Sequence, residues 1–367
     1  MNLHNLTVAV LFGGPSGEHE VSCISAFTIV KNLLENNYKV FPIAVSKEGK
    51  WYGPIQLEEI KSFDASKHAD KTLILPQQPG KKVFNESTGE VLAEIDVVFP
   101  IIHGSYGEDG HVQALLDMCR IPYVGAGVGG SVVGMDKVFM RDIFVAHDIP
   151  QTAYLAVRRH DFEEDTEAIL NRIEAQLEYP MFVKPASLGS SVGISRVENR
   201  EELAKGLVLA SRYDYKLLVE KGLVVREIET AVLGNYEVEI AEPGEIVTGE
   251  TFYDYEAKYV LDNSESIIPA PISETHKAQI KELAKKAYEV LDLSGLCRVD
   301  FFIDTEKDVV LLNEVNTLPG FTDISMYAKM WANNGRPLIE IVEKLLQLAI
   351  ERHQDMMRNY SVLGGNV

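Results

Sequence analysis

The sequence predicts an α/β protein whose first part is a doubly wound, Rossmann-like domain and whose later part mixes strands and helices in the α+β manner. Three observations support this prediction. An apolar run at residues 6–12 leads into a glycine-rich turn and a helical pattern over residues 21–34, as at the start of a doubly wound unit. From Thr152 onward, strand and helix patterns alternate less regularly. Near the end, apolar runs at residues 299–303 and 309–315 flank a polar turn, which predicts an antiparallel hairpin.

Length and charge limit the class of protein. The 367 residues, of which 46% are hydrophobic, suffice for two or three domains with cores of their own. The formal net charge of −20 argues against binding to nucleic acid or to an anionic membrane, because both need a basic surface. An anionic substrate would therefore need a local group of Lys, Arg or helix N-termini.

Cysteine usage and the first residues predict a cytoplasmic protein. Cys23, Cys119 and Cys297 lie far apart and form no C-x-x-C pair, which is typical of a reduced compartment and argues against a disulfide framework or a zinc site. The N-terminal stretch lacks a basic region and a small-residue cleavage site, so we expect no signal peptide. No apolar run has the length needed to cross a bilayer, so we expect no membrane span.

The C-terminal hairpin carries the strongest chemical signal. Because side chains alternate faces along a strand, Arg298 and Asp300 share one face of the first strand, and Glu314 and Asn316 share one face of the second. With the turn centred near Lys307, Asp300 lies opposite Glu314. Two adjacent carboxylates repel each other unless a cation lies between them, and hard oxygen ligands suit Mg²⁺. A solvated polar face is the alternative, but the apolar flanks indicate a buried hairpin, and we favour a metal site.

Three loops of glycine and other small residues follow predicted strands. The first, GGPSGEHEVS, lacks the G-x-G-x-x-G spacing of a dinucleotide site, and Glu18 within it also suits the dipole of the following helix. The second, HGSYGEDG, places His103 and Glu108 at the end of a strand, where ligands bind in open α/β sheets, although packing or turn roles are equally open. The third, residues 186–193, follows Lys184 and suits either a phosphate-binding loop or a simple hairpin turn.

Two later segments suggest nucleotide contacts and a lid. Residues 217–220 form an apolar strand that leads into Lys221, and the edge of such a strand can bond adenine and ribose. Residues 251–266 form a long polar loop, whose tyrosines argue against disorder. Lys258 and Tyr259 are therefore candidates for a lid that touches the ligand. The polar stretch 49–94 supports no assignment.

Together these segments resemble the D-alanine–D-alanine ligases of the ATP-grasp superfamily. The motifs GGPSGEHEVS, HGSYGEDG, MDK, VKPASLGSSVG, LLVEKGL with VREIE, YDYEAKY, RVDF and NEVNTLPG occur in that family's order, from about Val8 to Ser325. The last four are the most specific. The resemblance implies an N-terminal Rossmann-like domain at residues 1–134 and a two-lobed ATP-grasp fold, with a central lobe at 135–222 and a C-terminal lobe at 223–367.

The resemblance also implies an activity. An enzyme of this family joins two D-alanine molecules through an acyl phosphate formed from ATP, for peptidoglycan synthesis, with two Mg²⁺ or Mn²⁺ ions and commonly as a cytoplasmic homodimer. A D-alanine–D-lactate ligase is the nearest alternative, although the unaltered EAKY lid argues against it. A nicotinamide-dependent oxidoreductase leaves the metal hairpin unexplained, and a non-catalytic small-ligand binding protein has no need of the charged residues kept here.

Roles for individual residues follow from the resemblance alone. The catalytic group would comprise Glu18, Ser190, Tyr259, Arg298 and Gly320. The two D-alanine substrates would be held by Glu18, His103, Arg298, Ser325 and Met326. ATP would be bound by Lys137, Lys184, Glu220, Lys221, Leu223, Glu227, Lys258 and Asn313. The metal ions would be held by Asp300, Glu314 and Asn316.

Overall fold

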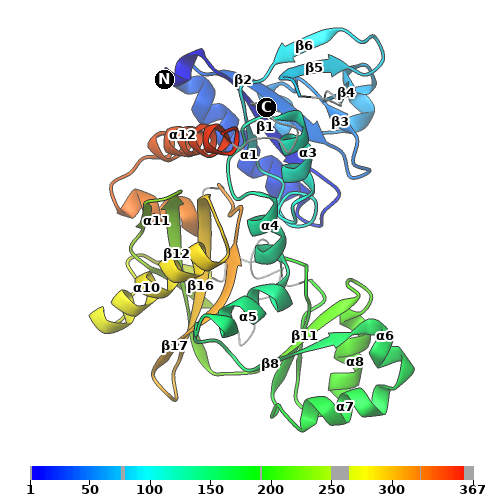
Figure 1. Ribbon diagram of the computed structural model, residues 1–367, viewed down its shortest axis with the longest axis vertical. Coiled ribbons are helices and arrows are strands. Elements are labelled where there is room, and N and C mark those ends of the chain that lie inside the picture. Colours follow the sequence, from blue (N-terminus) through cyan, green and yellow to red (C-terminus); the bar gives the residue numbers. More distant parts are fainter. Residues whose placement is uncertain (1, 76–78, 191, 249–263, 323, 359–367) are drawn as a thin grey trace.

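The structure is a computed structural model that describes residues 2–75, 79–190, 192–248, 264–322 and 324–358. The first part of the chain forms an N-terminal domain. Its main sheet, at the top of Figure 1, has the strand order β3-β2-β1-β7, and β1 runs parallel to β2 and to β7. After a short 3-10 turn, η1 (Leu3–Asn5), the strands are β1 (Thr7–Gly13), β2 (Lys39–Val45), β3 (Trp51–Tyr52) and β7 (Val97–Pro100).

Different helices cover the two faces of this sheet. Val8 and Phe12 of β1 are buried in one cluster with α1 (His19–Glu35), whereas Leu11 is buried in another with α3 (His111–Cys119). Alternate residues of the strand thus serve opposite faces. The predicted doubly wound domain is confirmed, and its first strand and helix end within two residues of the expected positions.

The stretch that supported no assignment forms a small antiparallel sheet beside the main one. Its strand order is β4-β5-β6, and Val83 of β5 is fully buried. The elements that follow β3 are α2 (Leu57–Ile60), η2 (Ala65–Lys67), η3 (Ala69–Lys71), β4 (Leu73–Ile74), β5 (Lys82–Asn85) and β6 (Val91–Glu94). Such short elements leave too few residues for a periodic pattern.

The central lobe lies at the bottom of Figure 1 and has its own antiparallel sheet, in the order β10-β9-β11-β8. Its strands are β8 (Tyr154–Arg158), β9 (Met181–Pro185), β10 (Ser195–Val197) and β11 (Lys216–Lys221). Its helices are α6 (Arg159–Glu164), α7 (Thr166–Glu174) and α8 (Arg200–Ala210). Val183, Leu217 and Val219 of the strands are buried with Ile173 and Leu207 of the helices, which gives this lobe a separate core.

The C-terminal lobe is built on a second antiparallel sheet, in the order β15-β14-β12-β16-β17, with β13 paired to β12. Its strands are β12 (Val225–Gly234), β13 (Val238–Ile240), β14 (Gly244–Thr248), β15 (Ser264–Ile267), β16 (Gly295–Asp304) and β17 (Val309–Asn316). The loop predicted at residues 251–266 was wrong at its end, because residues 264–266 belong to β15, where they pair with β14. Most of that loop lies outside the described residues.

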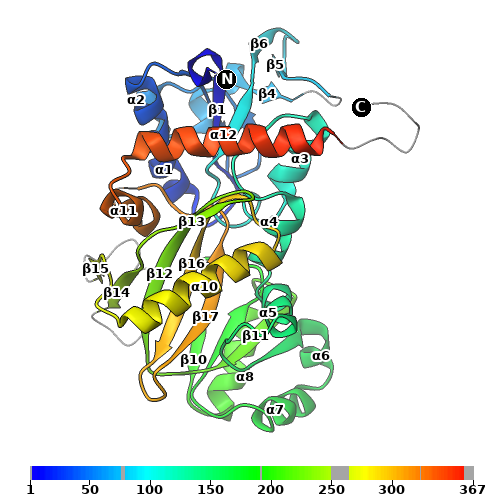
Figure 2. The same ribbon diagram turned by 60° about the vertical axis from the view of Figure 1, so that its left-hand side comes forward.

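Two helices connect the predicted domains. After α4 (Val128–Met135), helix α5 (Lys137–Ala146) packs with α10 (Glu274–Val290) in the core of the C-terminal lobe, although its sequence position is next to the central lobe. Helix α12 (Leu338–Met356) follows α11 (Met326–Asn333) and lies across the N-terminal domain (Figure 2).

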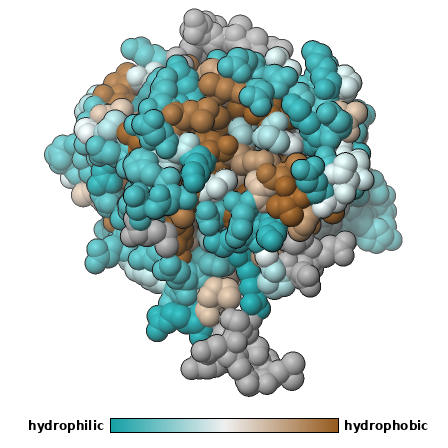
Figure 3. All heavy atoms as spheres, turned by 90° about the horizontal axis from the view of Figure 1, so that it is seen from above, coloured by the Kyte–Doolittle hydropathy of each residue, from teal (hydrophilic) through white to brown (hydrophobic). Residues whose placement is uncertain are grey.

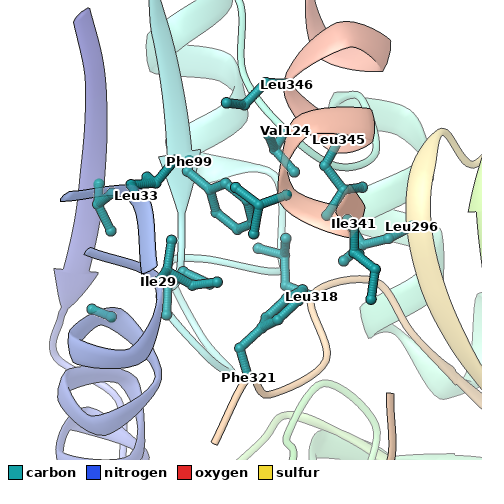
Figure 4. Close-up of a cluster of buried hydrophobic side chains, with 14 of the residues drawn as sticks. Ile29, Leu33, Phe99, Val124, Leu296, Leu318, Phe321, Ile341, Leu345 and Leu346 are labelled. Carbon is teal, nitrogen blue, oxygen red and sulfur yellow. The ribbon is translucent and has the colours of Figure 1, made fainter. Parts of the chain in front are cut away.

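The N-terminal domain and the C-terminal lobe share one hydrophobic core. Leu345 of α12 is buried with Ile29 of α1 and Phe99 of β7, and Leu318 and Phe321 join them from the chain after β17 (Figure 4). The domain limits expected from the sequence therefore do not coincide with the limits of the hydrophobic cores, because this core belongs to two of the expected domains. No helix among the described residues has the length and apolar character needed to span a membrane.

Candidate functional site

A cavity of about 600 Å³ lies where the N-terminal domain, the small-residue loop and the C-terminal hairpin meet. Many of the predicted site residues line it: Glu18, His103, Lys137, Ser190, Arg298, Glu314, Asn316, Gly320, Ser325 and Met326. They come from positions up to about three hundred residues apart in the sequence, so the fold brings together what the motifs only suggested. Lys258 and Tyr259 lie outside the described residues.

The hairpin of β16 and β17 has the predicted register. Asp300 pairs with Glu314, which confirms the expected facing pair, and Arg298 pairs with Asn316 by the same register. A β-bulge shifts the register between Asp300 and Phe301, because Asn313 is an extra residue on β17. Simple alternation along β17 would place Glu314 on the buried face with Leu312. Because the bulge adds one residue, the side chains after it point to the opposite face, and the half-buried Glu314 and Asn316 line the cavity.

Arg298 is held on this surface by two carboxylates. Its Nε and Nη2 atoms each donate to Asp300 at 2.7 Å, and its Nε atom lies 3.1 Å from Oε2 of Glu229 on β12. Burial disfavours the charged guanidinium, but Asp300 and Glu229 outweigh burial and raise the pKa of Arg298 well above its ordinary value. Arg298 is thus a fixed positive charge at the cavity wall.

The predicted metal ligands form an oxygen-rich set. The amide of Asn316 donates to Oδ2 of Asp300 at 2.9 Å, and the ammonium group of Lys137 lies 3.3 Å from Oε2 of Glu314. Among the described residues, no three His, Cys, Asp or Glu side chains are grouped as metal ligands. Two carboxylates and one amide oxygen fit a hard divalent cation that takes its other ligands from phosphate and water, as Mg²⁺ does.

Glu18 joins the N-terminal domain to the small-residue loop. The hydroxyl of Ser190 donates a hydrogen bond to its carboxylate. Ser190 has a φ of 54°, a left-handed conformation that is uncommon for serine and is found at functional sites. Gly104 also lies close to Glu18, since a Cβ atom at this glycine would be 2.7 Å from Oε2 of Glu18.

His103 and Glu108 both bond the chain that follows β17. Nδ1 of His103 lies 3.0 Å from the carbonyl oxygen of Leu318, and burial lowers the pKa of this histidine. The Glu108 carboxylate accepts hydrogen bonds from the N–H groups of Leu318, at 3.0 Å, and Gly104, at 2.6 Å. Burial, with a contribution from the charge of Glu18, raises the pKa of Glu108 to about 8.

The residues expected to bind ATP are more scattered. Of those that the structure describes, only Lys137 lines the cavity, where its ammonium donates to the carbonyl oxygen of Leu188 at 3.0 Å. Lys221 instead pairs with Glu178 at 2.7 Å. The other described members do not line the cavity: Lys184, Glu220, Leu223, Glu227 and Asn313.

Glu220 forms a buried cluster at the end of β11. Both Lys184 of β9 and Arg141 of α5 form ion pairs with its carboxylate. Burial opposes ionisation of this group, but the two cations hold the pKa of Glu220 below its ordinary value. The predicted phosphate lysine, Lys184, is therefore positioned by a carboxylate that connects the central lobe to α5.

Sequence reasoning missed several residues of this region. Arg141 follows Lys137 by one helical turn, and that spacing predicts a shared face. Glu229 alternates with Glu227 along β12 and pairs with Asp300 of β16. Ser25 lies on α1 at helical spacing from Glu18. Each of these residues lies at helical or strand spacing from a predicted site residue. That spacing could have identified it, but the motifs contain only its neighbours.

Comparison with known proteins finds similarity over nearly the whole chain. Two family models match, described as the N-terminus of D-ala D-ala ligase over residues 7–126 and its C-terminus over residues 143–347. A protein of Natranaerobius thermophilus named D-alanine--D-alanine ligase is 46% identical over 97% of this chain and 98% of its own length. A protein of the same name from Caldicellulosiruptor bescii is 44% identical over 95% of this chain and 96% of its own.

Solved structures of similar proteins share the fold. The D-alanine-D-alanine ligase from Coxiella burnetii has a TM-score of 0.84 and 34% identity, with 96% of each chain covered. The VanG D-Ala:D-Ser ligase from Enterococcus faecalis also has a TM-score of 0.84, with 33% identity over 94% of this chain and 99% of that one. Proteins that share this fold are thus named for different second substrates, D-alanine in one and D-serine in the other.

Proposed function

The chain belongs to the D-alanine–D-alanine ligase family and has the ATP-grasp fold of that family. We propose that it uses ATP to join two D-alanine molecules into D-alanyl-D-alanine, a precursor of peptidoglycan in the bacterial cell wall. The observation that carries the proposal is the cavity in which the carboxylate of Glu18, the guanidinium of Arg298 and the backbone of Gly320 meet. These groups suit an ammonium ion, a carboxylate and an oxyanion, respectively.

In the first step, a carboxylate oxygen of the first D-alanine attacks the γ-phosphorus of ATP. The bond between that phosphorus and the bridging oxygen breaks, and ADP leaves. Glu18 binds the ammonium group of this D-alanine, in an orientation supported by its contact with Ser190. His103 lies near the same substrate in our proposal, and its position in the cavity wall supports this. The product of the step is an acyl phosphate.

The nucleotide is held between the central and C-terminal lobes. Lys137 and Lys184 neutralise its phosphates, and Lys258 reaches the transferred phosphoryl group from the lid. Adenine and ribose are contacted by Glu220, Lys221, Leu223 and Glu227, and Asn313 is a further ATP-binding residue. Support for this arrangement comes from the Glu220 cluster, which holds Lys184 at the end of its strand. Charge neutralisation and positioning are the main requirements of phosphoryl transfer.

Asp300, Glu314 and Asn316 would hold two divalent cations, Mg²⁺ or Mn²⁺. Their oxygen atoms and their position on one face of the hairpin fit such ions. Cations held there would supply positive charge that neutralises the phosphates. Arg298, through its two hydrogen bonds to Asp300, orients one of these carboxylates.

In the second step, the amine of the second D-alanine attacks the carbonyl carbon of the acyl phosphate. The carbonyl oxygen gains negative charge, which Arg298 and the N–H group of Gly320 stabilise. The amine loses a proton, the bond from carbon to the phosphate oxygen breaks, and phosphate leaves. We infer that Ser190 and Tyr259, with Glu18, link the small-residue loop to the lid by hydrogen bonds.

Ser325 and Met326 bind the carboxylate of the second substrate. They stand at the start of α11, where backbone N–H groups have no partner within the helix. The side chain of Met326 lies against Gly244, so we infer that its contribution comes from its N–H group. D-Lactate is the alternative second substrate, and the D-Ala:D-Ser name of one structural neighbour adds D-serine to the panel that should be tested.

The remaining proposals concern organisation. We infer three domains along the sequence, at residues 1–134, 135–222 and 223–367, with α5 of the second packed on the third. We also infer a cytoplasmic location and a homodimer. Apolar surface among polar side chains is visible on the face in Figure 3, which looks down on the N-terminal domain. Surface of that kind is used in contacts between subunits.

Phosphate release from ATP and Mg²⁺ tests the proposed function. The purified chain is assayed with D-alanine, with L-alanine, and with D-alanine plus D-serine or D-lactate, and products are separated by mass. We expect release with D-alanine and formation of its dipeptide. A mixed ester would assign the D-lactate activity, and folded protein without turnover would favour the binding protein.

A further inference from the structure

Three side chains of the N-terminal domain hold the backbone of residues 318–321, which we call the 318–321 segment. The N–H group of Leu318 donates to Glu108 at 3.0 Å, and its carbonyl oxygen lies 3.0 Å from Nδ1 of His103. Three residues later, the N–H group of Phe321 donates to the hydroxyl of Ser25 at 3.3 Å. The segment follows β17, so these bonds join the C-terminal lobe to α1 and to the loop after β7.

The directions of these bonds are mutually consistent. Because Ser25 accepts from the N–H group of Phe321, its own proton is available to Nε2 of His103, which lies 3.1 Å away. The proton of the neutral imidazole is then on Nδ1, where the carbonyl oxygen of Leu318 accepts it. Burial, which lowers the pKa of His103, favours the same neutral form. Ser25, His103 and Leu318 therefore form one ordered chain of hydrogen bonds.

Glu108 fixes the same segment independently. One of its oxygen atoms accepts from Leu318 and the other from Gly104, so its carboxyl group bridges the loop after β7 and the segment. A glutamine in its place would direct its NH₂ group at one of these N–H groups. Because both groups are donors, that hydrogen bond would be lost. The bridge thus depends on a carboxyl group and not on shape alone.

Gly320 lies between the two attachment points. A Cβ atom at Gly320 would be 2.8 Å from Oγ of Ser325, so the backbone here is set close to a residue of the second substrate site. A donor to an oxyanion must be placed within about half an ångström to be effective. We propose that Ser25 and Glu108 are positioning residues that place the N–H group of Gly320 for the second step of the reaction. This inference rests on the proposed function.

Separate measurement of the two steps tests the proposal. The first step is followed by the exchange of ¹⁸O between bridging and non-bridging positions of ATP in the presence of D-alanine, and the second by dipeptide formation. In the Ser25→Ala variant, dipeptide formation should fall by about 10- to 100-fold, because a displaced donor loses part of the effect of an absent one. The isotope exchange should remain within about threefold, so the ratio of exchange to dipeptide rises.

Ser22→Ala is the matched control. Ser22 lies one turn earlier on α1 and is equally buried, and its hydroxyl hydrogen-bonds to Gly13 and Ile101, neither of which belongs to the 318–321 segment. It should lose comparable stability and keep the wild-type ratio. Glu108→Gln provides a second variant should Ser25→Ala fail to fold, and it should raise the ratio in the same direction.

The outcomes separate the inference from the proposed function. A parallel fall of exchange and dipeptide in both variants, or an equal rise of the ratio in Ser22→Ala, would overturn the positioning role. A wild-type chain that makes no dipeptide would instead refute the proposed function, before any variant is compared.

Discussion

The hydroxyl of Ser190 donates a hydrogen bond to the carboxylate of Glu18, which lies 172 positions earlier in the chain. The bond connects the start of α1 to the small-residue loop of the central lobe. Since Glu18 is proposed to bind the ammonium group of the first D-alanine, this contact would couple substrate binding to the position of the small-residue loop. The first prediction tests that coupling.

Ser190→Ala should weaken binding of the first D-alanine. Removal of a hydrogen bond to a charged group costs about 1.5–3 kcal/mol, so the KM for D-alanine should rise by roughly tenfold or more, with a smaller fall in kcat. Steady-state kinetics over both D-alanine sites measure the change. An unaltered KM at the first site would contradict the role given to this contact.

Gly104→Ala should displace the carboxylate of Glu18, because the new methyl group would occupy the space beside it. Gly104 has a φ of 71°, and a Cβ atom there would press on Oε2 of Glu18. Gly89→Ala is the matched control, because Gly89 has a φ of 69° and open space around its Cβ position. Both variants should lose about 1–2 kcal/mol of unfolding free energy, from backbone conformation alone. Only Gly104→Ala should also raise the KM for D-alanine, and an equal rise in both would refute the explanation.

Arg298→Ala should remain folded and lose most activity. The loss of one oxyanion donor reduces kcat by about 10²–10³. Arg298→Lys should recover little, because one ammonium group cannot reproduce the two parallel hydrogen bonds to Asp300. Dipeptide formation and circular dichroism are measured together, and wild-type turnover in a folded Arg298→Ala protein would exclude this role.

Glu108 should make stability depend on pH. Its pKa is about 8 in the folded protein, against an ordinary value of 4.5, because of burial first and the charge of Glu18 second. The folded state therefore holds a proton that the unfolded state has lost, and stability falls as pH rises from about 4.5 to about 8. Arg298, and the N–H groups of Gly104 and Leu318, oppose this shift.

Unfolding free energies of the wild type and of Glu108→Gln at pH 5 and pH 8.5 test this dependence. The neighbouring His103 titrates in both proteins, so the difference between them isolates Glu108. The decline toward high pH should be smaller in Glu108→Gln. Equal declines in the two proteins would show that Glu108 ionises normally.

Much of the site could be predicted because strand geometry is strict. A period of two residues placed Arg298 and Asp300 of the first strand on one face. The pairing of Asp300 with Glu314 was expected from a turn centred near Lys307, but in the structure it depends on the bulge, because Asp304 pairs with Val309 on the turn side of it. The bulge at Asn313 was not visible in the sequence, since an extra residue in a strand depends on partners rather than on pattern. The small sheet of β4, β5 and β6 was missed because its strands are too short for a periodic signal.

Tertiary contacts explain what else the sequence did not reveal. Position in the chain placed α5 with the central lobe, but Met140 and Phe144 are buried in the core of the C-terminal lobe. Arg141 pairs with Glu220, which is 79 positions later in the sequence. Periodic patterns relate only residues that are close in sequence, so they cannot predict this pair. The bonds of Ser25 to the 318–321 segment are of the same kind.

The core shared by α1 and α12 has a consequence for the order in which the protein can fold. Ile341, Leu345 and Leu346 of α12 belong to that core, and they leave the ribosome long after α1 has been made. During synthesis, the nascent N-terminal domain therefore exposes the apolar surface that α12 later covers. Such surface promotes association between incomplete chains, so the first domain needs protection until translation reaches α12.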